Sequence, residues 1–202
     1  LVSVRVLQWS LCVTILFVIV HENFLQIRLC HTQVGDLTGG QYTKQIADVA
    51  AEQEADGTVC IDSFTGKERA GDTHVVIPDQ IDGLPVTKLA QEAFAYNDFV
   101  DTIVIPESVT FIGNSAFYHC SDLDAIVFRG QAPELEFTVA EGSSLKKLFV
   151  LESCQIGTFC ARLVNDLGAE RAAQVEVLTF GDLSALDEAY SAYVAELAAP
   201  AP

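Results

Sequence analysis

The chain has 202 residues, and its 28 acidic against 11 basic side chains give a net charge of −17. A surface this acidic repels phosphate backbones and anionic membranes, which excludes nucleic acid as an expected partner. Half of the residues are hydrophobic, which is enough for one or two domains with a buried core.

The first predicted element is an apolar run over residues 6–20, preceded by Arg5. It is shorter than the roughly 20 residues that a membrane-spanning helix needs, and no small-residue cleavage site follows it. Four interpretations of this run stay open. It is a signal sequence, an uncleaved signal-anchor, a stretch that is not natively translated, or a buried core strand or helix. Residues 1–30 are thus a signal-like or signal-anchor segment, and the only part expected to contact a membrane.

Residues 31–58 form the next segment, which is polar at first and then rich in Ala, Glu and Asp. This composition predicts a linker with at most a short helical turn. The ordered domain is expected to begin near Val59.

The middle of the chain repeats itself. Seven pairs of positions match at a spacing of 23 residues: Val86 and Val109, Leu89 and Ile112, Ala93 and Ala116, Phe94 and Phe117, Val100 and Leu123, Ile103 and Ile126, Ile105 and Phe128. A third copy follows 22 residues on, with Leu145, Leu148 and Val150. A period of 20–29 residues is typical of a solenoid, in which each coil buries a strand side and a return side against its neighbours.

The pattern within one repeat assigns the inside and the outside. In a stretch such as residues 123–128, alternate strand residues point to opposite faces, Pro106 follows a strand end, and Gly113 permits a tight bend or a positive φ. Cys120 takes an inward position that Asn97 holds in the preceding coil. The expected core residues are Val86, Leu89, Phe94, Ile103, Ile105, Val109, Ile112, Phe117, Cys120, Leu123, Ile126 and Phe128.

The outward strand positions are the candidate ligand-binding face. They are Thr102, Val104, Ala125, Val127, Lys147 and Phe149. Aligned coils would stack three of them, Val104, Val127 and Phe149, into an exposed apolar row, which often marks a partner site; ordinary β-propensity explains the row equally well. The strand starts are flanked by four acidic residues, Asp98, Asp101, Asp122 and Asp124. These residues either steer a basic partner or form a solvated rim.

The last element, residues 183–197, has one apolar stripe at helical spacing. The stripe contains Leu183, Leu186, Tyr190, Tyr193 and Leu197. The helix either caps the last coil or forms a short coiled coil, which fifteen residues barely support. Residues 181–202 are therefore an amphipathic helix followed by a Pro/Ala linker.

No motif predicts catalysis, a cofactor or a metal. The six cysteines show neither a CxxC pair nor zinc spacing; Cys154 and Cys160 are close enough for a local bridge, or are free buried thiols. His119 beside Cys120 lacks a third, orienting group. His21, His31 and His74 show no ligand spacing, and calcium, P-loop and dinucleotide motifs are absent.

Residues 103–128, IVIPESVTFIGNSAFYHCSDLDAIVF, resemble the BspA-type leucine-rich repeat of bacterial surface proteins. Residues 74–94 resemble the family's first coil, 58–66 the strand and turn before it, and 145–168 the closing coil sealed by a short helix. The stretch 129–144 departs from the pattern, since it lacks the Ala-Phe pair and the Cys, and its return side is expected to be irregular.

The resemblance implies an α/β repeat fold over residues 59–180, a leucine-rich-repeat β-solenoid of about four to five coils with parallel strands and a short helical C-terminal cap. It also implies a non-enzymatic protein that is extracellular or at the cell surface. Such a protein would bind a protein ligand, as in adhesion to a host or neighbouring cell. Two alternatives stay open: an intracellular interaction scaffold, and the recognition domain of a larger cell-wall enzyme.

Overall fold

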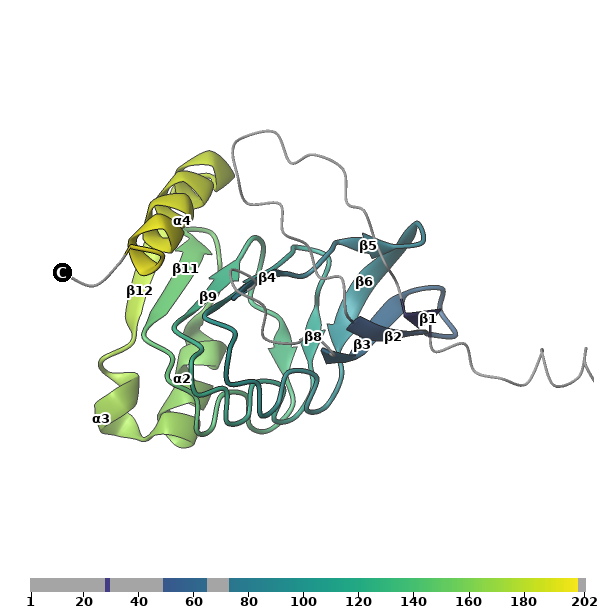
Figure 1. Cartoon of the computed structure of the whole chain (residues 1–202), viewed down its shortest axis with the longest axis horizontal. Coiled ribbons are helices and arrows are strands. Elements are labelled where there is room, and N and C mark those ends of the chain that lie inside the picture. Colours follow the sequence, from purple (N-terminus) through teal and green to yellow (C-terminus); the bar gives the residue numbers. More distant parts are fainter. Residues whose placement is uncertain (1–27, 30–48, 65–72, 200–202) are drawn as a thin grey trace, which may run out of the picture.

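The computed structural model describes residues 28–29, 49–64 and 73–199, which form two sheets and a set of C-terminal helices (Figure 1). One sheet has five parallel strands in the order β12-β11-β9-β7-β4. The other has seven strands in the order β1-β2-β3-β6-β8-β10, with β5 paired to β6. A single buried cluster contains residues of both sheets. The fold is leucine-rich-repeat-like, with parallel strands and a C-terminal helix.

The five-stranded sheet contains β4 (His74–Val76), β7 (Thr102–Ile105), β9 (Ala125–Phe128), β11 (Lys147–Leu151) and β12 (Glu176–Phe180). The seven-stranded sheet contains β1 (Arg28–Leu29), β2 (Val49–Gln53), β3 (Val59–Phe64), β5 (Gln80–Ile81), β6 (Leu84–Leu89), β8 (Phe111–Ile112) and β10 (Glu134–Leu135). Each central repeat thus gives one strand to each sheet, as β7 and β8 do, and a bend leads to the next repeat.

The strand register follows the sequence period. Thr102 of β7 lies opposite Ala125 of β9, and Ile103 lies opposite Ile126, a shift of 23 residues. From β9 to β11 the shift is 22, with Ile126 opposite Leu148. On the return side Leu89 pairs with Ile112. The spacing of the apolar residues therefore sets the pairing, because a slip by one residue would turn every inward side chain outward.

The core between the sheets is aliphatic with a line of aromatic rings. All twelve residues assigned to the core from the sequence are buried in one cluster. The rings of Phe64 and Phe94 stack at 5.3 Å between centroids, and Phe94 contacts Phe117 at 5.7 Å. Each repeat thus covers the ring of its neighbour, which explains why a single repeat is not stable alone.

Two residues of the opening motif have specific packing roles. A Cβ on Gly113 would lie 2.6 Å from the backbone nitrogen of Gln91, so the glycine is required for close approach of two repeats and not for a positive φ. The Cys120 thiol donates to the Phe94 carbonyl oxygen at 3.1 Å. Burial raises the pKa of Cys120 to about 12, which keeps the thiol protonated.

On the return side the repeats contribute the strands β6, β8 and β10, and the next segment, which follows β11, is a helix. Helix α2 (Gly157–Leu167) packs Phe159 against Phe128 at 5.0 Å between ring centroids. Its Asp166 carboxylate accepts the backbone N–H groups of Val139 (2.7 Å) and Ala140 (3.0 Å). In the divergent stretch 129–144, these two buried residues stand where Ala116 and Phe117 stand one repeat earlier.

The C-terminal part continues through helix α3 (Ala169–Ala172), strand β12 and helix α4 (Leu183–Leu197). Asp182 caps α4 by accepting the Ala185 N–H at 2.9 Å. In Figure 1 α4 lies along β11 and β12, which it contacts.

The described strands begin earlier in the chain than the domain start expected near Val59. Residues 49–53, assigned to the linker from composition, form β2, which pairs antiparallel with β3; β1 pairs with β2 in turn. Alternating burial of Val49 and Ala51 explains the strand. The predicted signal-like segment, apart from Arg28 and Leu29, and residues 31–48 of the linker lie outside the described residues. No helix in the described part of the chain is long and apolar enough to cross a membrane.

Candidate recognition surface

The outer face of the five-stranded sheet carries the six residues predicted to bind a ligand. Strand pairing places Thr102, Ala125 and Lys147 in one row. A second row, two residues further along each strand, contains Val104, Val127 and Phe149. The rows are therefore arranged as the sequence predicts, with one residue per repeat.

Helix α4 covers this face, so the expectation that the six residues are exposed to solvent is wrong. Five of the six residues are buried, namely Thr102, Val104, Ala125, Val127 and Phe149, and Lys147 is half-buried. The four apolar ones, Val104, Ala125, Val127 and Phe149, form a second buried cluster, separate from the core between the sheets. The other members of this cluster are Leu186, Tyr190, Tyr193 and Val194 of α4. The Phe149 ring contacts Tyr193 at 5.4 Å and Tyr190 at 5.9 Å.

Polar contacts fix the position of α4 on the sheet. The hydroxyl groups of Thr102 and Tyr190 lie 2.6 Å apart, and Thr102 Oγ1 also lies 3.0 Å from Nδ1 of His74. Burial lowers the pKa of His74, and the nearby Asp101 carboxylate opposes this shift. Just beyond β9, the Arg129 guanidinium makes a bidentate ion pair with the Asp187 carboxylate of α4, with a 3.0 Å bond between Nη2 and Oδ2.

Lys147 belongs to the same interface. Its ammonium group lies 4.5 Å from the centre of the Tyr193 ring, which is cation–π distance, and 3.7 Å from a Glu176 carboxylate oxygen. The lysine therefore packs against α4 and β12 and is not held out as a free charge. Of the six predicted residues, none is fully exposed.

The sequence predicts that the helix at residues 183–197 packs against the protein, but it does not predict which surface the helix covers. The apolar stripe of residues 183–197 predicts a helix, and the structure buries its middle, at Leu186, Tyr190 and Tyr193. The two ends of the stripe, Leu183 and Leu197, are 39% and 38% exposed. A stripe shows that a helix packs on something; it does not say which surface of the repeats it packs on.

The four acidic residues at the strand starts have different environments. Asp98 and Asp122 are exposed, and Asp101 is half-buried. Asp124 is buried and forms an ion pair with Lys146. The two exposed aspartates are thus the ones available to a basic partner.

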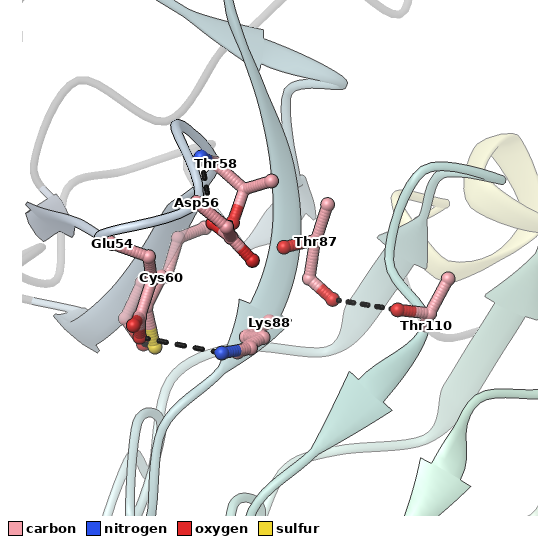
Figure 2. Close-up of polar contacts among 8 residues, drawn as sticks. Glu54, Asp56, Thr58, Cys60, Thr87, Lys88 and Thr110 are labelled. Carbon is pink, nitrogen blue, oxygen red and sulfur yellow. Dashed lines mark hydrogen bonds and ion pairs between the residues drawn. The ribbon is translucent and has the colours of Figure 1, made fainter.

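The opposite end of the molecule carries a polar cluster on the turn between β2 and β3 and on the strands β3 and β6, shown in Figure 2. Lys88 lies 3.5 Å from the Glu54 carboxylate, and Asp56 accepts hydrogen bonds from the Thr58 N–H (3.0 Å) and hydroxyl (2.7 Å). Burial raises the pKa of the adjacent Cys60 to about 11. A protonated thiol and paired charges give this cluster a structural role in joining the antiparallel strands to the repeats.

The remaining cysteine and histidine candidates do not converge on a reactive site. Cys120 points into the core toward Phe94, whereas His119 is exposed. Cys154 and Cys160 are free and half-buried, and burial raises the pKa of both thiols. Among the described residues no group of three or more His, Cys, Asp or Glu side chains could hold a metal ion. Cys12, Cys30, His21 and His31 lie outside those residues.

Comparison with known protein families supports the repeat assignment. Residues 74–166 match the family model of the BspA type leucine rich repeat region, in six copies. This match confirms the resemblance predicted from the repeated positions. The matched residues 74–166 include strands of both sheets, from β4 to β11.

Two solved structures are similar to parts of the chain. A leucine rich cell surface protein from Faecalibacterium prausnitzii A2-165 is 23% identical with a TM-score of 0.37, over 50% of this chain and 30% of that chain. A leucine-rich repeat protein from Bacteroides capillosus ATCC 29799 is 22% identical with a TM-score of 0.42, over 65% of this chain and 93% of that chain. The chain thus spans less than a third of the length of the first. No curated protein matches the chain.

Proposed function

We propose that this chain is a non-enzymatic protein-recognition module of a surface or secreted bacterial protein, with adhesion as its role. The observation that carries the proposal is the match of residues 74–166 to BspA-type repeats. Stacked repeats of this kind form a solenoid, here of about four to five coils, whose repeated side chains present an extended surface to another protein. The apolar run at residues 6–20 supports export.

The outer face of the five-stranded sheet is the first candidate for this recognition, and it binds a partner only when α4 leaves it. Two features favour such a movement. The cluster under α4 is separate from the core between the sheets, so the repeats keep their own core without the helix. Only Gly181 and Asp182, both exposed, connect β12 to α4.

Adhesion at this face can be tested on an immobilised extracellular-matrix coat. A chain with Tyr190→Ala and Tyr193→Ala loses the main anchors of α4 and should bind the coat more tightly than the wild type. Adding Val104→Asp to that chain should remove the gain, because the charge lies in the uncovered row. Equal binding by all three proteins would overturn the assignment of this face.

The location can be tested separately by protease treatment of intact producing cells. Loss of peptides from residues 59–180 would place the repeats outside the cell and agree with adhesion. Protection in intact cells, with cleavage only after lysis, would contradict export and favour the intracellular scaffold.

A further inference from the structure

The bends that precede the strands of the five-stranded sheet carry a cluster of aromatic rings on the surface. The Tyr96 ring stacks on the His119 ring at 5.8 Å between centroids and an angle of 12°. Tyr118 packs edge-on against both, at 5.4 Å from Tyr96 and 4.3 Å from His119. Tyr96 is nevertheless 70% exposed. These three residues, from two successive repeats, are called the bend triad.

The backbone at these positions does not favour a ring. Tyr96 has φ 58° and His119 has φ 53°, a region that side-chain-bearing residues rarely adopt. At the corresponding position of the next repeat stands Gly142, with φ 74°. The repeat thus accepts glycine here, and glycine avoids the strain that a side chain adds.

Burial does not offset this strain at Tyr96. The ring leaves most of its surface in water, and its neighbours Phe94 and Asn97 already supply the buried contacts of the bend. The backbone conformation itself is held by the hydrogen bond from the Tyr96 N–H to the Tyr118 carbonyl oxygen at 2.8 Å, which does not require a ring at residue 96. Strained residues that the surrounding structure holds in this way cluster at functional sites. An exposed aromatic face in such a conformation is therefore a candidate binding surface.

The charge around the bend triad selects the kind of ligand. Asp98 follows Tyr96 by two residues and Asp122 follows His119 by three. Glu141 lies one repeat further, where its carbonyl oxygen accepts the His119 N–H at 2.8 Å. All three acidic residues are exposed, and none of them has an ion-pair partner within residues 49–64 and 73–199.

We propose that the bend triad binds a cationic side chain, preferentially arginine, on an exposed segment of the partner protein. A guanidinium group is planar and stacks on an aromatic face. Asp98 and Asp122, which lie within three residues of the rings along the chain, would compensate its charge. The Tyr96 ring offers its free face, since His119 covers the other. This inference rests on the proposed protein recognition and names the chemistry of the partner at a surface that is open with α4 in place.

A titration with short peptides tests the inference. The probes are a Gly/Ser peptide with two arginines and the same peptide with citrulline, which keeps the shape and removes the charge. We expect the arginine peptide to shift the NMR signals of the Tyr96 and His119 rings and the citrulline peptide to leave them unchanged. Equal shifts with both peptides would overturn the proposal.

The matched variants are Tyr96→Gly and Phe137→Gly. Tyr96→Gly should lower the affinity for the arginine peptide about tenfold, a loss of about 1.4 kcal/mol, and should leave the unfolding midpoint near that of the wild type. Phe137 is 66% exposed but lies outside the triad, so Phe137→Gly should retain the affinity. If both variants bind like the wild type, the acidic surface alone attracts the peptide and the proposal is wrong.

The matrix-coat assay separates this inference from the proposed function. If the chain binds the coat and Tyr96→Gly does not weaken that binding, recognition stands and the role of the bend triad fails. If the triad binds arginine peptides but intact cells protect the repeats from protease, the site stands and the surface role fails.

Discussion

The outer face of the five-stranded sheet and the bends that lead into it both place one side chain per repeat in a row. On the sheet the row is apolar, and α4 covers it. On the bends the row contains two aromatic residues and a glycine in left-handed backbone, and Tyr96 stays in water. The comparison shows that a repeated outward position is not yet an open surface, because a segment outside the repeats can occupy it.

Both rows are carried by repeats that share the core between the sheets, and the largest effect is expected in that core. Phe117 is fully buried and contacts Phe94 of the preceding repeat. Phe117→Ala should lower the free energy of unfolding by about 3–5 kcal/mol, because the cavity lies between two repeats. Urea denaturation measures the loss. Phe137→Ala, at an exposed ring, should change it by less than about 0.5 kcal/mol; similar losses for both variants would contradict the assigned core.

Val127→Asp tests the covered row. Val127 is fully buried between the sheet and α4, so an aspartate there would place a carboxylate without a partner under the helix. We expect a loss of about 3 kcal/mol or more, together with faster hydrogen exchange in residues 183–197 than in the repeats. Val177→Asp is the control, since Val177 is 39% exposed on β12. Slow exchange in α4 of Val127→Asp would show that the helix does not cover this row.

The same substitution shows how far the sequence alone could lead. The 22- and 23-residue spacing predicts the strand register and the inward side chains, because these depend on contacts between equivalent residues. From the repeats alone Val127 faces outward and should tolerate a charge. Its cover comes from residues 183–197, outside the repeat period. Similarly, β2 depends on pairing with β3, which the composition of residues 49–53 does not reveal.

Gly142→Ala measures the backbone preference on which the bend triad rests. Gly142 has φ 74°, and a Cβ there would lie 3.0 Å from His119 ring atoms. The substitution should cost about 1–2 kcal/mol in urea denaturation. Gly157→Ala is the control, because Gly157 lacks a positive φ and a Cβ there would meet nothing within 4 Å. A neutral Gly142→Ala would mean that the bend does not disfavour side chains, which weakens the case for Tyr96.

Asp187→Asn tests how much the ion pair with Arg129 contributes to holding α4 on the sheet. The Arg129–Asp187 pair is partly exposed, with 26% and 44% of the two side chains accessible to solvent. Solvent screening limits such a pair, so we expect a loss of about 0.5–1 kcal/mol. A double-mutant cycle with Arg129→Gln measures the coupling. No coupling would leave docking to the apolar cluster together with the Thr102–Tyr190 and Lys147–Tyr193 contacts.

The smallest expected effect is the pH dependence of the contact between His74, Thr102 and Tyr190. Burial lowers the pKa of His74 from its ordinary value of 6.5, so the folded protein binds a proton less readily than the unfolded chain. The stabilising contribution of neutral His74 is therefore complete above pH 6.5 and is lost as the pH falls toward the folded pKa.

The measurement is a difference between two proteins, because the many carboxylates of this chain also titrate in acid. Unfolding midpoints of the wild type and of His74→Gln are compared from about pH 7 to about pH 5, the range in which histidine changes charge. The wild type should lose more stability than the variant over this range. Asp101 favours the charged imidazole and opposes the shift. If the wild type instead becomes more stable relative to the variant as the pH falls, the effect of this carboxylate on the pKa of His74 exceeds the effect of burial. The covered row would then be held more firmly at low pH, the reverse of the expected behaviour.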